Sequence, residues 1–356
     1  MKICVIGLGY VGLPLLFSLT KKFNVTGFDI SKKKIDQLRN NADYTGEVSN
    51  KKLKKINFNV TNKKSELRNF DVYIVCVPTP VLKNKNPNLN FIKQSSKIVG
   101  NAIKGSKLKP VIVLESTVYP GCSEEICIPI IEKYSNLKLN KEFYFGYSPE
   151  RINPGISKHK LNNTTKIISS SEKTSLKKLK KIYGSITKKI YVAQNIKTAE
   201  AAKVIENIQR DLNIALMNEL SIIFNRIDIN TKDVLEAAAT KWNFSYYEPG
   251  LVGGHCIGID PYYMSYLTKK IGLKKNNMIL AGRKTNEYMN SFIINNLFRL
   301  IRLKGMKLKK SKILILGYTF KENCNDVRNS KILEIFKQLK NKVDKVDLFD
   351  PIARNN

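Results

Sequence analysis

The fold is decided by residues 1–16, MKICVIGLGYVGLPLL, in which a short apolar run leads into three closely spaced glycines. The glycines follow the pattern G-x-G-x-x-G at Gly7, Gly9 and Gly12. In a strand–turn–helix unit, Gly7 allows the tight turn, Gly9 lets the backbone approach a pyrophosphate, and Gly12 permits close packing of the helix on the strand. The stretch therefore predicts a dinucleotide site at a helix N-terminus. A tight turn without a ligand is the alternative.

An acidic residue lies where this fingerprint requires one. Asp29 ends the second candidate strand, about 20 residues after Gly7, where a carboxylate can accept hydrogen bonds from both ribose hydroxyls. Such a carboxylate favours NAD over NADP because it repels a 2′-phosphate, although Lys33 and Lys34 leave room for some tolerance of NADP. We therefore expect NAD as the cofactor.

Five apolar runs alternate with helical patterns in the first half of the chain. The runs are KICVIG (2–7), NVTGFD (24–29), DVYIVCVP (71–78), PVIVLES (110–116) and FYFGYS (143–148). Continuous Val/Ile runs of this kind fit strands that are buried on both faces of a parallel sheet. The expected fold class is α/β, with a doubly wound, Rossmann-like sheet in an NAD-binding domain at residues 1–195.

Polar residues follow two of these strands. Pro78 and Thr79 come after the third strand, and Ser116 and Thr117 come after the fourth. The C-terminal ends of strands line the ligand crevice in such sheets, so these residues are candidate contacts to the cofactor or to water. Ordinary turn chemistry is the alternative for each of them.

The second half of the chain has a different pattern. Residues 197–227 contain no Gly or Pro and repeat apolar residues at helical spacing, which predicts one long helix. We assign residues 196–304 to a central helical domain that mediates dimerisation. Residues 305–356 hold a further strand–helix–strand unit that is too small for an independent sheet domain. Either this unit packs on the rest of the protein or the C-terminal domain is incomplete, and we expect the latter.

The composition is that of a globular protein. Apolar content is 42% and charged content is 26%, and no apolar run approaches the ~20 residues that span a bilayer, so we expect a cytoplasmic protein without a membrane partner. The net charge of +33 comes from scattered lysines, which we interpret as solvated faces rather than as a nucleic-acid site. Six cysteines without a C-x-x-C pair, and two histidines, argue against a disulfide framework and a metal site.

A thiol and a carboxylate share a glycine-rich loop. The run GGHCIGIDP (253–261) places Cys256 shortly before Asp260. A thiol with so little apolar cover can add to an aldehyde carbon, and the carboxylate can accept or donate the protons that the reaction transfers. An inert loop cysteine is the alternative here, and Cys4 and Cys76, inside strand-like runs, are expected to be inert core residues.

Two further pairs of polar side chains are candidates for chemistry. Glu150 and Arg151 lie in a proline-flanked loop after the fifth strand, where Glu150 can position water and Arg151 can bind an anionic or polar ligand; a surface salt bridge is the alternative. Lys203 and Asn207 share one face of the predicted long helix and can stabilise an alkoxide on a substrate carbon. A lysine-rich solvated face is the alternative for that pair.

Seven ordered blocks resemble the UDP-glucose/GDP-mannose dehydrogenase family. They are GLGYVGLPL, VPTP, ESTVYPG, YSPERINPG, AEAAKVIENIQRDLNIALMNEL, PGLVGGHCIGIDPYY and GYTFKENCNDVRNS, and the resemblance runs from Met1 to the end of the chain. YSPERINPG and GLVGGHCIGIDPYY are more similar to the branch that oxidises UDP-N-acetylhexosamines than to the UDP-glucose branch. That branch makes uronic acids for bacterial surface polysaccharides.

The resemblance implies a four-electron oxidation of the sugar C6 hydroxyl to a carboxylate, with two NAD molecules used in turn. Asp260 and an ordered water take the proton in the first oxidation, while Lys203 stabilises the alkoxide. Cys256 then adds to the aldehyde as a thiohemiacetal, because an aldehyde becomes a good hydride donor only when a nucleophile makes it tetrahedral. Oxidation gives a thioester, which water hydrolyses with help from Glu150.

The resemblance also implies a homodimer, with a UDP-sugar as the substrate, and a set of ligand contacts. Thr117 and Asn207 join the catalytic residues. The implied cofactor contacts are Gly7, Gly9, Tyr10, Val11, Gly12, Asp29, Lys34, Pro78, Thr79, Ser116, Thr117 and Arg328. The implied substrate contacts are Arg151, Lys203, Asn207, Tyr247, Gly250, Gly253, Arg283, Phe320 and Lys321.

Three alternatives remain at this point. One is a UDP-glucose or UDP-N-acetylmannosamine 6-dehydrogenase, and another is a two-electron hydroxyacid dehydrogenase of related architecture, which needs no thiol. The third is a truncated nucleotide-binding remnant, since family members continue past the point equivalent to Asn356. Two residues also depart from the family pattern: Cys122 replaces a hydroxyl residue, and Glu248 replaces a residue that is often basic.

Overall fold

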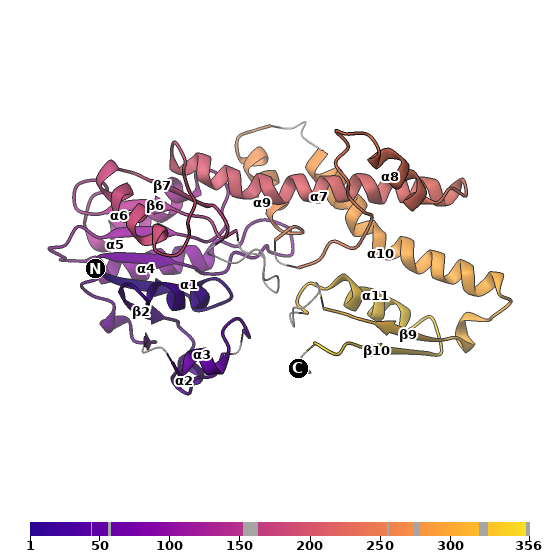
Figure 1. The fold of residues 1–356 in the computed structure, drawn as a ribbon, viewed down its shortest axis with the longest axis horizontal. Coiled ribbons are helices and arrows are strands. Elements are labelled where there is room, and N and C mark those ends of the chain that lie inside the picture. The colour runs from indigo at the N-terminus through magenta and orange to yellow at the C-terminus, as the bar shows by residue number, and fades with distance from the viewer. Residues whose placement is uncertain are drawn as a thin grey trace. The chain divides into compact units, whose positions relative to one another are not determined.

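The computed structural model describes residues 1–43, 45–55, 58–151, 163–254, 256–273, 278–319 and 327–353 (Figure 1). It contains two compact units, residues 1–204 and 205–356, and each is described by itself. The division falls within the long helix α7 (Ile196–Arg226).

An eight-stranded sheet forms the centre of the first unit, in the order β3-β2-β1-β4-β5-β6-β7-β8. All neighbouring strands are parallel except β6 and β7, which are antiparallel. The strands are β1 (Lys2–Ile6), β2 (Asn24–Phe28), β3 (Asn59–Thr61), β4 (Val72–Val75), β5 (Val111–Leu114), β6 (Tyr144–Tyr147), β7 (Lys166–Ser170) and β8 (Ile190–Val192).

The central strands are apolar because both faces of the sheet are covered. All four residues of β4 and all four residues of β5 are buried, as expected for a sheet with helices on both sides. Figure 1 shows helices packed around this sheet. They are α1 (Gly12–Leu19), α2 (Lys32–Arg39), α3 (Asn50–Leu53), α4 (Asn90–Ile103), α5 (Ile128–Ser135) and α6 (Lys173–Gly184), with short turns at Lys64–Glu66 and Ser123–Cys127.

The carboxyl ends of β1, β4, β5 and β6 share one edge of the sheet, since these four strands are parallel neighbours. The antiparallel strand β7 begins at that same edge. Its register pairs Tyr147 with Ser169 and Gly146 with Ser170. Continued past the strand ends, this register brings Lys166, the first residue of β7, opposite Glu150.

The second unit is mainly helical. It contains the rest of α7, α8 (Thr231–Ala239), α9 (Asp260–Lys270), α10 (Met278–Leu303), a short turn at Leu308–Lys310, β9 (Lys312–Leu316), α11 (Lys331–Leu339) and β10 (Lys345–Phe349). Helix α10 packs closely on α7, because a Cβ atom added at Gly282 would lie 2.6 Å from Cδ2 of Leu212. A larger residue at Gly282 would require the Leu212 side chain to move.

The two parallel strands β9 and β10 are only half-covered. Exposed and half-buried residues alternate along both. Ile294 of α10 packs with Ile335 and Leu339 of α11 in a small core against the sheet's inner face, while Leu316 is 72% exposed. This sheet therefore buries one face, unlike the sheet of the first unit.

The predicted α/β class and the five predicted strands are confirmed. The five predicted strands pair in parallel. Three further strands, β3, β7 and β8, were not predicted, and β7 pairs antiparallel with β6. The long helix predicted at residues 197–227 is confirmed as α7. The three-domain division at residues 195 and 304 stays a prediction. Within the described part of the chain, no helix combines the length and apolarity that a membrane crossing requires.

Candidate functional site

The glycine turn between β1 and α1 has the geometry of a dinucleotide cradle. Gly7 adopts φ +93°, and a Cβ atom there would lie 2.7 Å from the carbonyl oxygen of Cys76. A Cβ at Gly12 would clash with the carbonyl of Gly7, whereas a Cβ at Gly9 would meet nothing within 4 Å. The turn is therefore closed on the protein side at Gly7 and Gly12 and open at Gly9, as the approach of a pyrophosphate requires.

Asp29 is held in place beside this turn. It is 6% exposed, and its carboxylate accepts hydrogen bonds from the backbone N–H groups of Leu8 (3.0 Å) and Ser31 (2.9 Å). Lys34 Nζ lies 3.4 Å from Oδ2. A carboxylate keeps further lone pairs for ribose hydroxyls after these contacts. The chain's own residues thus fit NAD at this position.

The remaining candidate cofactor residues of the first unit lie at the same sheet edge. Ser116 is buried and donates to the carbonyl of Val77 (2.7 Å), which ties the ends of β4 and β5 together. Among the other candidates, Pro78 is exposed and Tyr10, Val11, Thr79 and Thr117 are half-buried.

Glu150 belongs to a buried cluster that sequence reasoning missed. Lys166 Nζ lies 2.9 Å from Oε2 of Glu115 and 3.7 Å from Oε2 of Glu150. The hydroxyl of Tyr183 donates to Oε1 of Glu115 (2.6 Å). The other oxygen of Glu150 accepts from the backbone N–H of Arg151 (2.6 Å). Arg151 in turn donates to the carbonyl of Thr165 (2.8 Å), so the loop after β6 is bound to the start of β7.

Burial dominates the electrostatics of this cluster. Desolvation raises the pKa of Glu115, an effect that Lys166 opposes and Glu150 reinforces. Burial disfavours the charge on Lys166, but Glu115 and Glu150 outweigh it and raise the pKa of Lys166. The Tyr183 pKa is also raised, by burial and then by Glu115. The ammonium is therefore a firmly held charge between two carboxyl groups.

Lys203 follows a second buried carboxyl group on α7. Lys203 is 8% exposed, and Glu200, one turn earlier, is fully buried. Glu200 accepts from the backbone N–H groups of Gly121 (2.6 Å) and Ser123 (3.0 Å), which fixes α7 to the loop that follows Thr117. Burial raises the pKa of Glu200 to about 7 despite these hydrogen bonds.

The predicted nucleophile lies in the second unit. Cys256 is exposed, whereas Cys4, Cys76, Cys122 and Cys127 are buried. Cys4 and Cys76 are core residues, and burial raises the pKa of both thiols well above the ordinary value, which disfavours the reactive thiolate. The exposure of Cys256 agrees with the prediction that its loop leaves the thiol uncovered.

Asp260 and Asn207 meet as a pair. Asp260 begins α9 and is 3% exposed, and its Oδ2 accepts from Nδ2 of Asn207 at 2.5 Å. The backbone N–H of Asp260 donates to the carbonyl of Cys256 (2.9 Å), so the thiol and the carboxylate belong to one helix-entry turn. Sequence spacing predicted that closeness, whereas the contact with Asn207 was not foreseen.

Arg283 is buried in an ion pair. Its exposed fraction is 3%, and Nη1 lies 2.6 Å from Oδ1 of Asp211. Asn286 donates to the same oxygen (2.7 Å) and accepts from Nδ2 of Asn218 (2.7 Å). Asn218 also bonds both the N–H (2.7 Å) and the carbonyl (3.0 Å) of Gly250. The guanidinium thus serves to hold this loop on α7 and α10, and its role as a ligand contact stays a prediction.

The remaining substrate candidates are placed as follows. The hydroxyl of Tyr247 accepts from Nε2 of Gln209 (3.2 Å). A Cβ added at Gly253 would lie 2.7 Å from the carbonyl of Asn329, which explains the glycine there. Arg328 is exposed in a turn. Phe320 and Lys321 lie outside the described residues.

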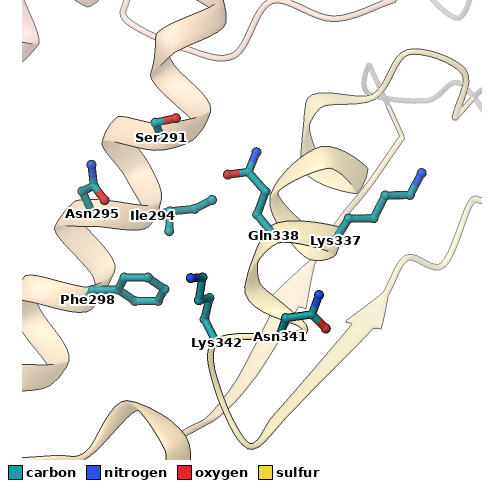
Figure 2. Close-up of a pocket in the computed structure, with 8 residues that line it drawn as sticks. All are labelled: Ser291, Ile294, Asn295, Phe298, Lys337, Gln338, Asn341 and Lys342. Carbon is teal, nitrogen blue, oxygen red and sulfur yellow. The ribbon is translucent and has the colours of Figure 1, made fainter.

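A hollow of about 470 Å³ lies in the second unit between α10 and α11 (Figure 2). It is lined by Ser291, Ile294, Asn295, Phe298, Lys337, Gln338, Asn341 and Lys342, and contains none of the predicted site residues. Within the described ranges, no group of three or more His, Cys, Asp or Glu side chains is arranged to hold a metal ion.

The geometry agrees with comparisons to known proteins. The NAD-binding domain of the UDP-glucose/GDP-mannose dehydrogenase family matches residues 1–187, the central domain matches residues 197–288, and the UDP-binding domain matches residues 314–356. The chain belongs to this family. Its cofactor is NAD, its substrate class is a UDP-sugar, and it is an NAD-dependent nucleotide-sugar dehydrogenase.

Relatives within the family are similar over almost the whole chain. A UDP-N-acetyl-D-glucosamine 6-dehydrogenase of Salmonella typhi is 46% identical over 99% of this chain and 82% of its own length. One of the same name from Pseudomonas aeruginosa is 45% identical over 99% of this chain and 83% of its own. The solved UDP-D-ManNAc dehydrogenase of Pyrococcus horikoshii superposes with a TM-score of 0.91 at 30% identity, covering 99% of this chain and 84% of that one.

Proposed function

We propose that the chain oxidises the C6 hydroxyl of a UDP-N-acetylhexosamine to the carboxylate, and that the sugar is N-acetylglucosamine. The observation that carries this proposal is the 46% identity to a relative named as a UDP-N-acetyl-D-glucosamine 6-dehydrogenase, against 30% for one named as a UDP-N-acetyl-D-mannosamine dehydrogenase. The uronate would serve surface polysaccharide synthesis in the cytoplasm.

The glycine turn and Asp29 would hold NAD, which would supply the hydride acceptor for both oxidations. The chain's own residues transfer the protons and form the covalent bond to the sugar carbon. Lys203 stabilises the alkoxide as the C6 hydroxyl loses its proton, which Asp260 takes through a water. The hydrogen bond from Asn207 supports this assignment because it fixes the orientation of the Asp260 carboxylate.

Cys256 carries the second oxidation. Its sulfur forms a bond to the aldehyde carbon and its proton leaves to solvent, so that the carbon becomes tetrahedral and can lose a second hydride. The resulting thioester is hydrolysed by water. Glu150 takes a proton from that water, the carbon–sulfur bond breaks, and the carboxylate leaves while the thiol is regenerated. The exposure of Cys256 supports this role, because a buried thiol is inert.

The test measures NADH and uronate together for a panel of UDP-sugars. UDP-N-acetylglucosamine is expected to give two NADH per uronate, and Cys256→Ser is expected to lose at least about 1,000-fold in uronate formation, as removal of a covalent nucleophile does. Cys122→Ser, at a buried thiol, is the matched control.

Three outcomes would contradict the proposal. Uronate release by the Cys256→Ser variant at near the wild-type rate would exclude the covalent route. One NADH per sugar would favour a two-electron dehydrogenase. A preference for UDP-glucose or UDP-N-acetylmannosamine would reassign the substrate within the same family.

We also propose that the protein is a homodimer. Apolar side chains are exposed along α7, where Leu216 and Ile223 are 53% and 47% exposed and lie two turns apart on one side of the helix. Ile227, directly after α7, is 58% exposed. Trp242, which follows α8, is 91% exposed. Large exposed apolar groups of this kind mark interfaces. The molar mass in solution, measured by light scattering, tests the proposal.

A further inference from the structure

We propose that Lys166 is a positioning residue for the Glu150 carboxylate, and that Glu115 limits how strongly Lys166 attracts it. The proposal rests on the hydrolytic role of Glu150 given above. It concerns three charged side chains at one edge of the first unit's sheet: Glu115 after β5, Glu150 after β6 and Lys166 at the start of β7.

The geometry directs Lys166 at both carboxylates. Its Nζ lies 2.9 Å from Glu115 and 3.7 Å from Glu150, and the side chains of Lys166 and Glu115 are 6% and 0% exposed. Glu150 is the outermost of the three side chains, and 14% of its side chain is exposed. The backbone N–H of Arg151 holds its second oxygen. One carboxylate oxygen thus faces the backbone and the other faces the ammonium, which fixes the plane of the group that has to meet water.

Lys166 has two acidic neighbours at unequal distances. Its Nζ is 2.9 Å from Glu115 and 3.7 Å from Glu150, so Glu115 has the closer contact. A nearby ammonium favours the charged form of a carboxylate, whereas a second carboxylate opposes it. Lys166 therefore attracts the Glu150 carboxylate, and Glu115 weakens that attraction.

The other groups that face the cluster do not replace Lys166. The Tyr183 hydroxyl donates to Glu115, and burial, followed by Glu115, raises the pKa of the nearby Cys76 thiol, so both remain neutral. The Arg151 guanidinium is bonded to the carbonyl of Thr165. Lys166 forms an ion pair with Glu150, and Glu115 is the second anion beside the same ammonium.

The proposal predicts opposite shifts for two substitutions. Lys166→Met leaves two carboxyl groups close together without their cation, so the acid limb of the pH profile for uronate formation moves up by about 1 pH unit or more. Glu115→Gln leaves Lys166 with Glu150 alone, and the acid limb moves down. The double variant removes both charges, and the acid limb returns to near its wild-type position.

The experiment compares these variants in the full chain with NAD and UDP-N-acetylglucosamine. Lys63→Met is the matched control, because Lys63 lies at the same 3.7 Å from Glu66 but the two side chains are 71% and 50% exposed. Solvent screening predicts no shift there. A purely structural role would lower activity at every pH without moving the acid limb, or would move it in one direction for both variants, and either result would overturn the proposal.

A second readout separates this proposal from the function on which it rests. Infrared titration of carboxyl bands in ¹³C-glutamate-labelled protein, with Glu150→Gln to assign the band, follows the proton on Glu150 without turnover. If the wild type oxidises no UDP-sugar, the proposed function fails, while opposite band shifts in the two variants would still support the Lys166–Glu150 interaction. Unchanged bands in an active enzyme would refute the inference alone. If Lys166→Met does not fold, Glu115→Gln and the double variant decide the question.

Discussion

Lys166 in the first unit and Arg283 in the second are both buried cations, but their acidic partners differ. Lys166 is 2.9 Å from one buried carboxylate and 3.7 Å from another that is 14% exposed. Arg283 is 2.6 Å from buried Asp211, and its second partner, Glu287, is 3.9 Å away and 37% exposed. The second cluster is therefore a balanced pair with a solvent-screened neighbour, whereas in the first, two carboxylates share one buried ammonium.

The difference separates two uses of buried charge. Around Arg283, the amides of Asn286 and Asn218 extend the pair to the backbone of Gly250, so the polar network holds a loop on helices. Around Lys166, the extra carboxylate belongs to a residue with a proposed proton-transfer role. The network around Arg283 fixes structure, while the cluster around Lys166 includes the carboxylate that is proposed to take up a proton.

The largest effect is expected when the balanced pair is broken. Arg283→Met should lower the free energy of unfolding by about 3–5 kcal/mol, because it leaves Asp211 buried without its cation. Denaturant titration measures this loss. The double variant Asp211→Leu/Arg283→Met should recover to within about 1 kcal/mol of the wild type. A small loss in the single variant would mean that solvent reaches Asp211. The conclusion that the Arg283–Asp211 pair is a buried structural pair would then be wrong.

Glu200 extends the comparison to a buried acid that accepts hydrogen bonds from two backbone N–H groups. Its pKa of about 7 in the folded state lies above the ordinary value of 4.5. The folded protein therefore holds this proton more tightly than the unfolded chain. The contribution of this proton to the free energy of unfolding is fully present below pH 4.5 and is lost as the pH rises through about 7. The loss is on the order of 2–3 kcal/mol. In Glu200→Gln this pH dependence should disappear, as unfolding measured from pH 4 to 8 would reveal; equal slopes in both proteins would refute it.

The smallest effect is a difference between matched substitutions. Asp211→Asn leaves Arg283 with a distant, partly exposed partner, whereas Glu115→Gln leaves Lys166 with Glu150. Glu115→Gln should therefore cost about 1 kcal/mol less in unfolding free energy than Asp211→Asn. Equal costs in the two would mean that Lys166 gains nothing from Glu150.

The sequence predicted the elements whose signals are local. The glycine turn at residues 7–12, the buried Val/Ile runs of β1, β4 and β5, and the Gly- and Pro-free α7 each carry their own periodicity or spacing. Strand β7 does not, because KIISS begins with a lysine and ends in serines, which is typical of an exposed segment. Its antiparallel direction depends on pairing with β6 and has no local signal.

The site was predicted in the same uneven way. Cys256 and Asp260 are close in sequence, so their shared turn could be foreseen. Lys166 is one of 62 basic residues, and nothing in the sequence distinguishes a lysine that folding carries to a distant carboxylate. Glu115 did offer a signal, since an acid that directly follows four buried strand residues needs a buried partner. Asp211 lies on the same face of α7 as apolar residues and offered a similar, weaker one.

The exposed indole of Trp242 gives the molecule an optical property of its own. It is the single tryptophan among 356 residues, and its side chain is 91% exposed in the single chain. Indole emission therefore comes from one position in the second unit, and no second fluorophore of its kind contributes to the spectrum. A change in its colour or its quenching by small solutes reports on the surroundings of residue 242 alone, in the native chain and without a label.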